Sequence, residues 1–302
     1  MAKFVVYTVI VGGYDEVTQP SVIDERFDYV LFSDTHKEAY IGVWRVQPVP
    51  YESDLKYKKA RYPRLQPEKV LPNYDAWLYV DGNIQITSQW VYDRCVELYE
   101  RGVEWASVKH LWRDSIYEEI DWMIKAGWVH DYSILPWYKY LQEESYPHQL
   151  SSNQNFLYET GIIFRKKTDN VKKVNDIWWW SIENYVKRDQ FSLMYALWKV
   201  PEIKTDFFLP EGENAWTNEG HFKYANHNPH TRVLPQSAWE KMRHRCFRAA
   251  YGEDASYTIL LDKVCRHKHP MRMMHLWTAY AIVRYGYKVV IEMIKCRLPK
   301  RK

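Results

Sequence analysis

Three short apolar runs, each broken at once by glycine or polar residues, constrain the fold more than any other feature of this chain. They span residues 3–11, 29–32 and 76–80. Continuous β-branched and aromatic runs of this length are typical of strands buried on both faces of a sheet. Charged, helix-compatible segments separate them, and this alternation predicts an α/β fold.

The rest of the chain continues the alternation. Apolar runs predict strands at 105–109 and 157–164, and helical periodicity predicts helices at 53–64, 88–101, 115–126, 170–187 and 190–198. We expect Pro63 and Pro67 to end the first helix. The Trp178, Trp179 and Trp180 triplet is interpreted as core packing, because it continues an apolar helical spacing. We expect a first domain over 1–235 and a helical, basic appendage over 236–302.

Polar residues follow the carboxyl ends of the first three strands, where open α/β sheets bind ligands. The most informative are Asp81, Gly82 and Asn83. The carboxylate and amide oxygens suit Mg²⁺ or Mn²⁺, and glycine leaves room for a diphosphate to approach the backbone. Asp-Gly is also a common turn dipeptide, so a plain turn is the alternative interpretation.

Several motifs occur in an order that resembles one known family. They are Tyr7-Thr8-Val9-Ile10-Val11-Gly12-Gly13-Tyr14-Asp15, Phe32-Ser33-Asp34, Ala60-Arg61-Tyr62, Leu78-Tyr79-Val80-Asp81-Gly82-Asn83-Ile84, Lys109-His110, Arg113, Tyr117-Glu118-Glu119 and Arg188-Asp189-Gln190-Phe191-Ser192-Leu193. The family is a glycosyltransferase-like one, known from plant turgor and seed-mucilage proteins and from bacterial polysaccharide loci. The resemblance covers residues 4–199 and implies a GT-A-type fold, a Rossmann-type mixed sheet flanked by helices.

The resemblance also implies a nucleotide-sugar site that uses a divalent metal. The first strand and its loops would cradle the nucleotide through Thr8, Gly12, Gly13, Tyr14 and Asp34. Asp81 and Asn83 stand where such enzymes carry an Asp-x-Asp metal motif, with neutral Asn83 as the weaker ligand. Of the later histidines His221, His227 and His230, we expect His227 to be the last metal ligand.

The catalytic candidates are Asp189, Gln190 and Glu118. In the resembled family an Asp-Gln pair at this place faces the sugar, so we expect Asp189 nearest the reacting carbon. It would bind sugar hydroxyls, act as base or stabilise an oxocarbenium-like state; the alternative is an acidic helix cap. Glu118 and Glu119 point about 100° apart on a helix, so only one can act as acceptor-side acid or base. A structural salt bridge is the alternative for that pair.

Four basic side chains are candidates for the donor. Arg61 and Arg64 precede the third strand, and their guanidinium groups suit diphosphate oxygens. A solvated helix face is the alternative. Lys109 and His110 end a strand at the same sheet edge and could bind donor or acceptor hydroxyls, with a hydrogen-bonded buried histidine as the alternative.

These assignments predict an enzyme that moves a sugar from a nucleotide donor, expected to be a UDP-sugar, to a glycan or lipid-linked acceptor in polysaccharide biosynthesis, with Mn²⁺ or Mg²⁺ as cofactor. Trp112, Trp137 and Tyr138 would form an acceptor platform. The main alternative is a non-catalytic carbohydrate-binding protein, favoured by Asn83. A sugar nucleotidyltransferase would carry a glycine-rich basic loop after the first strand, where this chain has Asp15.

The net charge indicates which classes of binding partner to expect, and the cysteine spacing indicates the cellular compartment. A formal net charge of +4 is too small to favour nucleic acid. The four cysteines lie far apart, which favours reduced thiols in the cytoplasm. We expect no signal peptide and no membrane span. The basic, aromatic stretch 271–302 is interpreted as a packing helix with a solvated tail, or as an interfacial helix on anionic lipid at the inner membrane face.

Overall fold

The computed structural model describes residues 2–149, 156–214, 217, 220–225 and 237–297. The chain divides into two compact units. The first comprises Met1–Ile116 and Gln149–His230, and the second comprises Tyr117–His148 and Thr231–Lys302.

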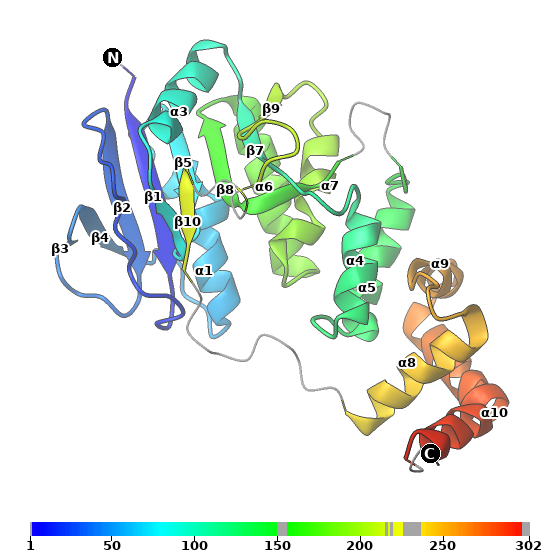
Figure 1. The fold of residues 1–302 in the computed structure, drawn as a ribbon. Helices are drawn as coiled ribbons and strands as arrows, with labels where there is room; N and C mark the ends of the chain where they lie inside the picture. The colour runs from blue at the N-terminus through cyan, green and yellow to red at the C-terminus, as the bar shows by residue number, and fades with distance from the viewer. Residues whose placement is uncertain (1, 150–155, 215–216, 218–219, 226–236, 298–302) are drawn as a thin grey trace. The chain divides into compact units, whose positions relative to one another are not determined.

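An eight-stranded mixed sheet forms the first unit (Figure 1). Its strands are β1 (Phe4–Ile10), β2 (Phe27–Ser33), β3 (Tyr40–Ile41), β4 (Trp44–Pro48), β5 (Ala76–Val80), β7 (Trp105–Lys109), β8 (Tyr158–Lys166) and β9 (Thr205–Phe207). They lie in the order β3-β4-β2-β1-β5-β8-β7-β9. β1 is parallel to β2 and β5, and β8 is antiparallel to both β5 and β7. The carboxyl ends of β1, β2, β5 and β7 therefore meet the start of β8 at one sheet edge.

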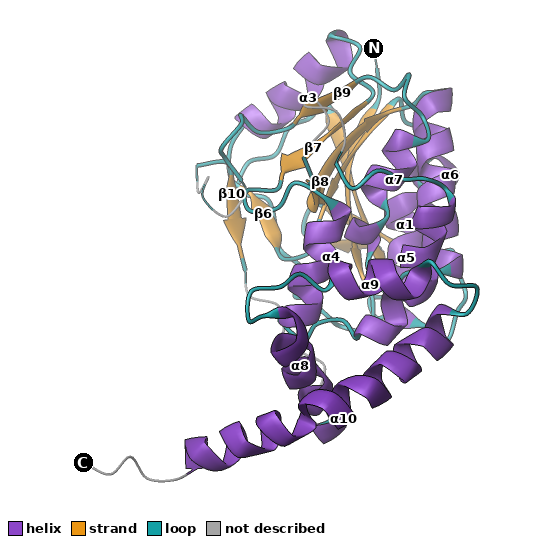
Figure 2. Cartoon of the chain, turned by 90° about the vertical axis from the view of Figure 1, so that its right-hand side faces the viewer, coloured by secondary structure: helices purple, strands orange, loops and turns teal. Residues whose placement is uncertain are grey.

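Helices cover both faces of this sheet (Figure 2). They are α1 (Lys56–Leu65), α2 (Pro67–Val70), α3 (Trp90–Glu100), α6 (Asp169–Asn184), the 3₁₀ turn η1 (Asp189–Phe191) and α7 (Leu193–Trp198). α1, α6 and α7 lie on one face; α3 and the two-stranded antiparallel sheet of β6 (Ile84–Ile86) and β10 (Phe222–Tyr224) lie on the other. This confirms the predicted fold class, a mixed α/β sheet flanked by helices.

The pleat of β1 and β5 decides which residues meet α1. Val6 and Leu78 share an apolar cluster with residues of α3. Successive side chains of a strand point to opposite faces, so Tyr7 and Tyr79 point the other way. The Tyr7 hydroxyl accordingly donates a 2.9 Å hydrogen bond to the Arg64 carbonyl of α1.

Two predicted helices have different ends in the structure. Pro63 lies inside α1 and does not end it, because the next turn is still closed by the Gln66 N–H, which donates to the Tyr62 carbonyl at 2.9 Å. Pro67 starts α2, a first-turn position that needs no N–H donor. The predicted helix 190–198 divides at Ser192 into η1 and α7.

The second unit is helical. Its helices are α4 (Ile116–Lys125), α5 (Asp131–Glu143), α8 (Ala238–Tyr251), α9 (Thr258–Cys265) and α10 (Pro270–Arg297). The sequence analysis did not predict α5, which contacts α9 and α10. The division at residue 235 assigns α5 to the first domain, whereas the observed contacts group it with the C-terminal helices. The division of the chain into domains at residue 235 therefore stays a prediction.

Buried polar contacts hold α5 in the second unit. Arg243 of α8 pairs with Asp131, and both side chains are buried. The Tyr138 hydroxyl donates to Asp262 at 2.9 Å. Trp137 and Tyr138 are fully buried, so the prediction that they form an acceptor platform is wrong: they fill the core.

Three general expectations can be compared with the described residues. None of the helices there is long and apolar enough to cross a membrane. Cys95, Cys246 and Cys265 are buried and form no disulfide with another described cysteine. Trp178 and Trp179 are buried in the core as predicted, whereas Trp180 is 36% exposed.

Candidate active site

Asp81 stands directly after β5 and is fixed by its neighbours. The Tyr79 hydroxyl donates to Asp81 Oδ1 at 2.7 Å, and the Asp81 N–H donates to the Gly161 carbonyl of β8 at 2.8 Å. A Cβ atom at Gly161 would lie 3.2 Å from Asp81 Oδ2, so glycine leaves space beside the carboxylate. The carboxylate is one-third exposed, at 33%.

Arg64 bridges Asp81 to Asp189. Its Nη1 atom lies 2.8 Å from Asp189 Oδ2 and 3.4 Å from Asp81 Oδ1. The guanidinium carbon lies 4.6 Å from the centre of the Tyr79 ring, and Nη2 donates to the Thr160 carbonyl. The side chains of Arg64 and Asp189 are only 11% and 6% exposed. We call Asp81, Arg64 and Asp189 the carboxylate bridge.

Asp189 is held in place at the start of η1. The Trp178 indole donates to its carbonyl oxygen at 2.8 Å, and the Gln190 N–H donates to its Oδ1 at 3.1 Å. Arg61 Nη2 lies 3.7 Å from the same Oδ1. Asp189 is the acidic residue in the first turn of η1, directly after the cap residue Arg188, and its carboxylate also faces Arg64 and Arg61.

The two carboxylates of the bridge differ in acidity. Burial alone would raise the pKa of Asp189, but Arg64, Arg61 and Arg188 together hold it below its usual value. For Asp81, burial outweighs Arg64 and raises the pKa. Asp189 is therefore firmly ionised at neutral pH, whereas the charge on Asp81 is opposed by its surroundings. Neighbouring acids tuned in opposite directions are typical of functional sites.

A buried polar network around Arg165 holds the backbone of Arg64. Arg165 of β8 is fully buried, and its guanidinium donates to the Arg64 carbonyl at 2.6 Å, to the Tyr7 hydroxyl, and to Asn175 Oδ1 at 2.8 Å. This network was not predicted from the sequence. Its signal was an arginine inside an apolar strand, since arginine is almost never fully buried unless it has partners.

The loops after β1 and β2 carry the residues that were predicted to bind the nucleotide. The Gly12 N–H donates to Asp34 Oδ1 at 2.7 Å. Gly12 and Gly13 have φ angles of 66° and 63°, a left-handed conformation that favours glycine. Tyr14 is 40% exposed beside them. The structure thus brings four of the predicted nucleotide-binding residues together.

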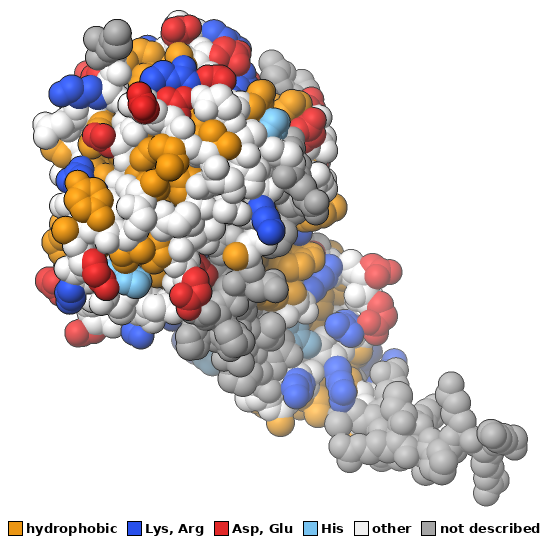
Figure 3. Space-filling model, turned by 60° about the vertical axis from the view of Figure 1, so that its left-hand side comes forward, with side chains coloured by type: hydrophobic (Ala, Val, Ile, Leu, Met, Phe, Trp, Pro, Cys, Tyr) orange, Lys and Arg blue, Asp and Glu red, His pale blue; other side chains and the backbone are white. Residues whose placement is uncertain are grey.

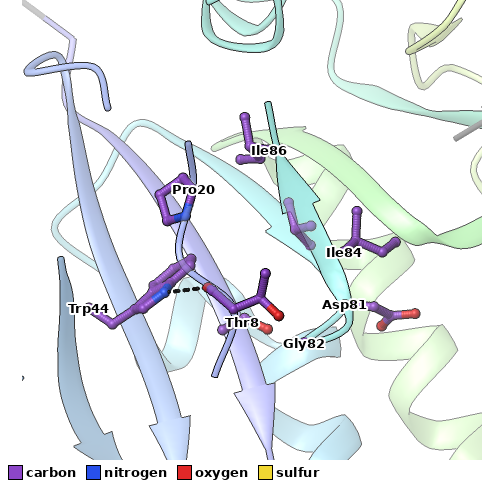
Figure 4. A pocket seen from close by; sticks show the side chains of 9 residues that line it. Thr8, Pro20, Trp44, Asp81, Gly82, Ile84 and Ile86 are labelled. Carbon is purple, nitrogen blue, oxygen red and sulfur yellow. Dashed lines mark hydrogen bonds between the residues drawn. The ribbon is translucent and has the colours of Figure 1, made fainter. Parts of the chain in front are cut away.

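Thr8, the fifth, lines a small cavity with Trp44 and Gly82 (Figure 4). Its volume is about 10 Å³, which holds about one water molecule. The Trp44 indole donates to the Thr18 carbonyl at 2.9 Å, and the Asp81 carboxylate points away from Thr8 (Figure 4). Among the described residues, the buried Thr8 hydroxyl has no hydrogen-bond partner. This cavity is far too small for a nucleotide.

The β5–β6 turn uses Asn83 for a backbone contact. Asn83 Nδ2 donates to the Ala225 carbonyl at 3.1 Å, and the Ala225 N–H donates back to the Asn83 carbonyl at 2.8 Å. The Ile84 N–H donates to the Asp81 carbonyl at 2.9 Å and closes the turn. A Cβ at Gly82 would lie 2.9 Å from Ile10, so packing against β1 also demands glycine.

The donors at this sheet edge determine whether a metal ion fits there. Among the described residues, no three His, Cys, Asp or Glu side chains gather in a metal-binding group. Mg²⁺ nevertheless uses only one or two protein carboxylates when a substrate phosphate and water complete its shell. Asp81 fits that role, and the nearby Asp15, which the sequence analysis did not select, raises the pKa of Asp81 by its charge. His227 lies outside the described residues.

The neighbours of Lys109 and Glu118 are different residues from those that surround the carboxylate bridge. Lys109 pairs with Glu211, and its Nζ lies 5.8 Å from the centre of the Phe207 ring. Glu118 is exposed on α4 of the second unit, whereas its neighbour Glu119 is fully buried there. Roles for Lys109 and Glu118 in the reaction remain predictions.

His110 is buried and hydrogen-bonded. Its Nδ1 accepts from the N–H groups of Trp112 and Arg113 at 3.1 and 3.2 Å, and Arg113 Nη2 lies 2.7 Å from its Nε2. Burial, with added repulsion from Arg113 and Arg188, lowers its pKa from 6.5 to about 4. The imidazole is therefore neutral at physiological pH.

We expect His110 to make the protein lose stability on acidification. Between pH 6.5 and 4, His110 becomes protonated in the unfolded chain but stays neutral in the folded protein. The free energy of unfolding therefore decreases as the pH is lowered, by about 3 kcal/mol in all. Urea unfolding at pH 7, 5.5 and 4 measures this decrease. It should be smaller in His110→Gln than in the wild type, and it should be unchanged in the exposed control His267→Gln. Equal pH dependence in all three proteins would contradict the assignment.

Comparison with known proteins gives one family. The model described as TOD1/MUCI70, glycosyltransferase-like domain, matches residues 1–221. This range contains the whole carboxylate bridge and both glycine-loop residues. A search of curated proteins found no match.

Solved structures give weak similarities. The apo structure of the bifunctional glycosyltransferase WbbM is 12% identical, with a TM-score of 0.37, over 69% of this chain and 39% of that one. This chain thus spans well under half of WbbM. Apo mouse xyloside xylosyltransferase 1 is 9% identical, with a TM-score of 0.40, over 68% and 84%. Core-mannan synthase A from Aspergillus fumigatus, in a Mn/GDP form, is 8% identical, with a TM-score of 0.37, over 69% and 73%.

Proposed function

Because this chain belongs to the TOD1/MUCI70 glycosyltransferase-like domain family, we propose that it transfers a sugar from a nucleoside diphosphate donor, preferably a UDP-sugar, to a hydroxyl of a glycan or lipid-linked acceptor. The observation that carries the proposal is the carboxylate bridge at the ligand-binding edge of the sheet. There Arg64 holds Asp81 and Asp189 at 3.4 and 2.8 Å, from two different chain segments. Such a reaction would serve polysaccharide biosynthesis.

On the donor side, Asp81 is the residue that would hold a divalent cation, with Asp15 adding negative charge beside it. When bound, Mn²⁺ or Mg²⁺ supplies charge neutralisation for the departing diphosphate. Asp81 suits this because its own charge is poorly compensated: burial raises its pKa. Tyr79 orients the carboxylate by its 2.7 Å hydrogen bond to Oδ1.

Asp189 has the opposite character. Arg64, Arg61 and Arg188 hold its pKa low, against the effect of burial, and a carboxylate that binds protons so weakly is a poor general base at neutral pH. We therefore favour a permanently charged role for Asp189, as acceptor of sugar hydroxyl hydrogen bonds and as the stabiliser of positive charge developing at the anomeric carbon. Gln190 keeps Arg188 close, because its Oε1 accepts from Arg188 at 2.9 Å.

The direct test is a screen of nucleotide sugars with Mn²⁺. We expect one donor class to be hydrolysed slowly without an acceptor, with release of nucleoside diphosphate, and NMR of the released sugar gives the anomeric outcome. If the pure protein binds no nucleotide and hydrolyses no donor, and glycan binding is unchanged by UDP and Mn²⁺, the enzyme proposal is wrong.

We expect Asp81→Asn to separate binding from stability. Loss of the charge should weaken Mn²⁺-dependent UDP binding at least about tenfold, because a neutral amide is a poor ligand for a hard cation. The pKa of Asp81 is higher in the folded protein than in the unfolded chain, so the ionised carboxylate makes folding less favourable at pH 7. Replacing it with a neutral amide should therefore not lower the free energy of unfolding at pH 7. Calorimetry with and without Mn²⁺, and urea unfolding, measure the two effects.

The control for this variant is Asp176→Asn, an exposed acid of α6 that pairs with Lys69. It should leave UDP binding unchanged. Unaltered Mn²⁺-dependent binding in Asp81→Asn would remove Asp81 from the metal site, whatever donor the protein uses.

A carbohydrate-binding protein without turnover is the second candidate. It is favoured by Asn83, whose side-chain amide is hydrogen-bonded to the Ala225 backbone, a structural contact. Such a protein should bind glycans with the same affinity in the presence and absence of UDP and Mn²⁺. An enzyme should bind its acceptor more tightly, or only, when the donor nucleotide is present.

A further inference from the structure

A stripe of exposed apolar side chains runs along α10 of the second unit. Its members are Leu276 (54% exposed), Tyr280 (57%), Val283 (84%), Tyr287 (60%), Val290 (45%) and Ile291 (46%). The steps of four and three residues between them keep the stripe on one helix face. An apolar row of this length is unusual on a surface exposed to water.

The opposite face of α10 holds the helix in its own unit. Met274, Thr278, Ala281 and Val289 are all at most 2% exposed. Ala281 and Val289 form an apolar cluster with Cys246 of α8. Among the described residues of this unit, α10 therefore packs through the face opposite the stripe.

Charge is strongly segregated toward this helix. Residues 270–302 contain eight Lys and Arg and one Glu, a formal charge of 8 − 1 = +7. The whole chain has +4, so the preceding 269 residues sum to 4 − 7 = −3. No Asp or Glu occurs in residues 263–291. Arg272, Arg284 and Lys288 are exposed on α10 itself.

The cations lie beside the stripe. At 100° per residue, Arg272 projects on the same face as Leu276, one turn later, and Arg284 borders the stripe next to Tyr280 and Tyr287. In the space-filling view, Lys and Arg side chains share the visible surface of the second unit with apolar ones (Figure 3). Long cationic side chains at the border of an apolar stripe can reach phosphate groups while the stripe is buried in lipid.

We propose that α10 is an interfacial helix that binds an anionic lipid bilayer. The stripe enters the boundary between headgroups and acyl chains, the two tyrosines lie at headgroup level, and Arg272, Arg284 and Lys288 contact lipid phosphates. Charge complementarity selects this occupant over a second copy of the chain. Two copies of α10 would place cations beside cations, since residues 270–297 contain five Lys or Arg and one acid, Glu292.

Vesicle sedimentation tests the proposal with the full-length protein. We expect binding to vesicles of phosphatidylcholine and phosphatidylglycerol at a ratio of about 70:30, no measurable binding to pure phosphatidylcholine, and at least about tenfold weaker binding at high salt. Absence of binding to the anionic vesicles, or equal binding to both kinds, would overturn the proposal.

Two variants divide the apolar from the electrostatic part. Val283→Gln with Val290→Gln removes apolar stripe contacts, and Arg284→Glu with Lys288→Glu reverses the bordering charge; each should weaken binding to anionic vesicles at least about tenfold. The control is Lys172→Glu with Lys173→Glu, the same charge change on exposed positions of α6, which should bind like the wild type. Because all substituted side chains are exposed, thermal unfolding should be unchanged.

The competing occupant has its own readout. Light scattering after size exclusion should show one oligomeric state for the wild type and the stripe variant. A wild-type dimer that the Val283→Gln, Val290→Gln variant dissociates, together with unaltered vesicle binding, would assign the stripe to a second copy and overturn the lipid proposal.

Discussion

Asp189→Asn is expected to lower kcat for sugar transfer by about 10²- to 10⁴-fold and to leave the affinity for UDP within about threefold of the wild type. The asparagine keeps the shape of the side chain but removes the charge that Arg64 and Arg61 hold ionised. If this charge stabilises the anomeric carbon only as the bond to the diphosphate breaks, its loss acts on the transition state and not on nucleotide binding.

Initial rates over a range of donor concentrations, with calorimetry of UDP binding, separate the two effects. The expected result is a fall in kcat with a nearly unchanged KM for the donor. Asp176→Asn, the exposed acid used above, should alter neither quantity. Loss of UDP binding in a folded Asp189→Asn protein would place the residue on the nucleotide and not on the sugar.

Arg64→Ala is expected to lower the free energy of unfolding by about 3–5 kcal/mol at pH 7, because it leaves a buried carboxylate without its nearest cation. Asp189 would retain Arg61, at 3.7 Å, and the charge of Arg188, around a carboxylate whose side chain is only 6% exposed. The bond from Arg64 to the Thr160 carbonyl would also be lost. Urea unfolding measures the effect directly.

The pH dependence of that loss identifies its cause. The folded-state pKa of Asp189 is depressed, so its ion pair stabilises the wild type above the unfolded value of 3.8 and this contribution disappears as the pH falls through the lower, folded value. The difference between wild type and Arg64→Ala should therefore shrink below about pH 4. A difference that is constant with pH would indicate lost packing and not a lost ion pair.

A double variant provides the matched comparison. Arg64→Ala with Asp189→Ala should be destabilised by less than the sum of the two single variants, since removing both charges leaves neither buried alone. Lys69→Ala is the control, because Lys69 and Asp176 are each 44% exposed and an exposed pair is worth at most about 1 kcal/mol. If the double variant is destabilised by the sum of the two single effects, Arg64 and Asp189 are not energetically coupled.

The sequence predicted the strands that build the site, because their signals are local. Continuous apolar runs located β1, β5 and β7 within a few residues, and the polar residues that end them marked the sheet edge at which the candidate site lies. Asp81 was selected for this reason. The ordered motifs also identified the glycosyltransferase-like family, which the family model matches over residues 1–221.

Elements without such a signal were missed or mislocated. α5 contains Pro136, and its role becomes visible only through its contacts with α9 and α10. Pro63 was expected to end α1, but the helix tolerates it because the turn around it is closed by Gln66. In both cases packing or neighbouring hydrogen bonds outweigh a local propensity.

The sequence by itself determined the strand pattern, the glycine loop and the acid at the end of β5, since continuous apolar runs and turn residues are signals carried by neighbouring residues. Only the tertiary structure decided that Arg64 joins Asp81 to Asp189 and that Arg165 supports it from β8. Those contacts depend on β8 lying next to β5 and on α1 packing over that face. Strand order and helix packing bring together residues that are far apart in the chain, and no local pattern encodes which of them meet.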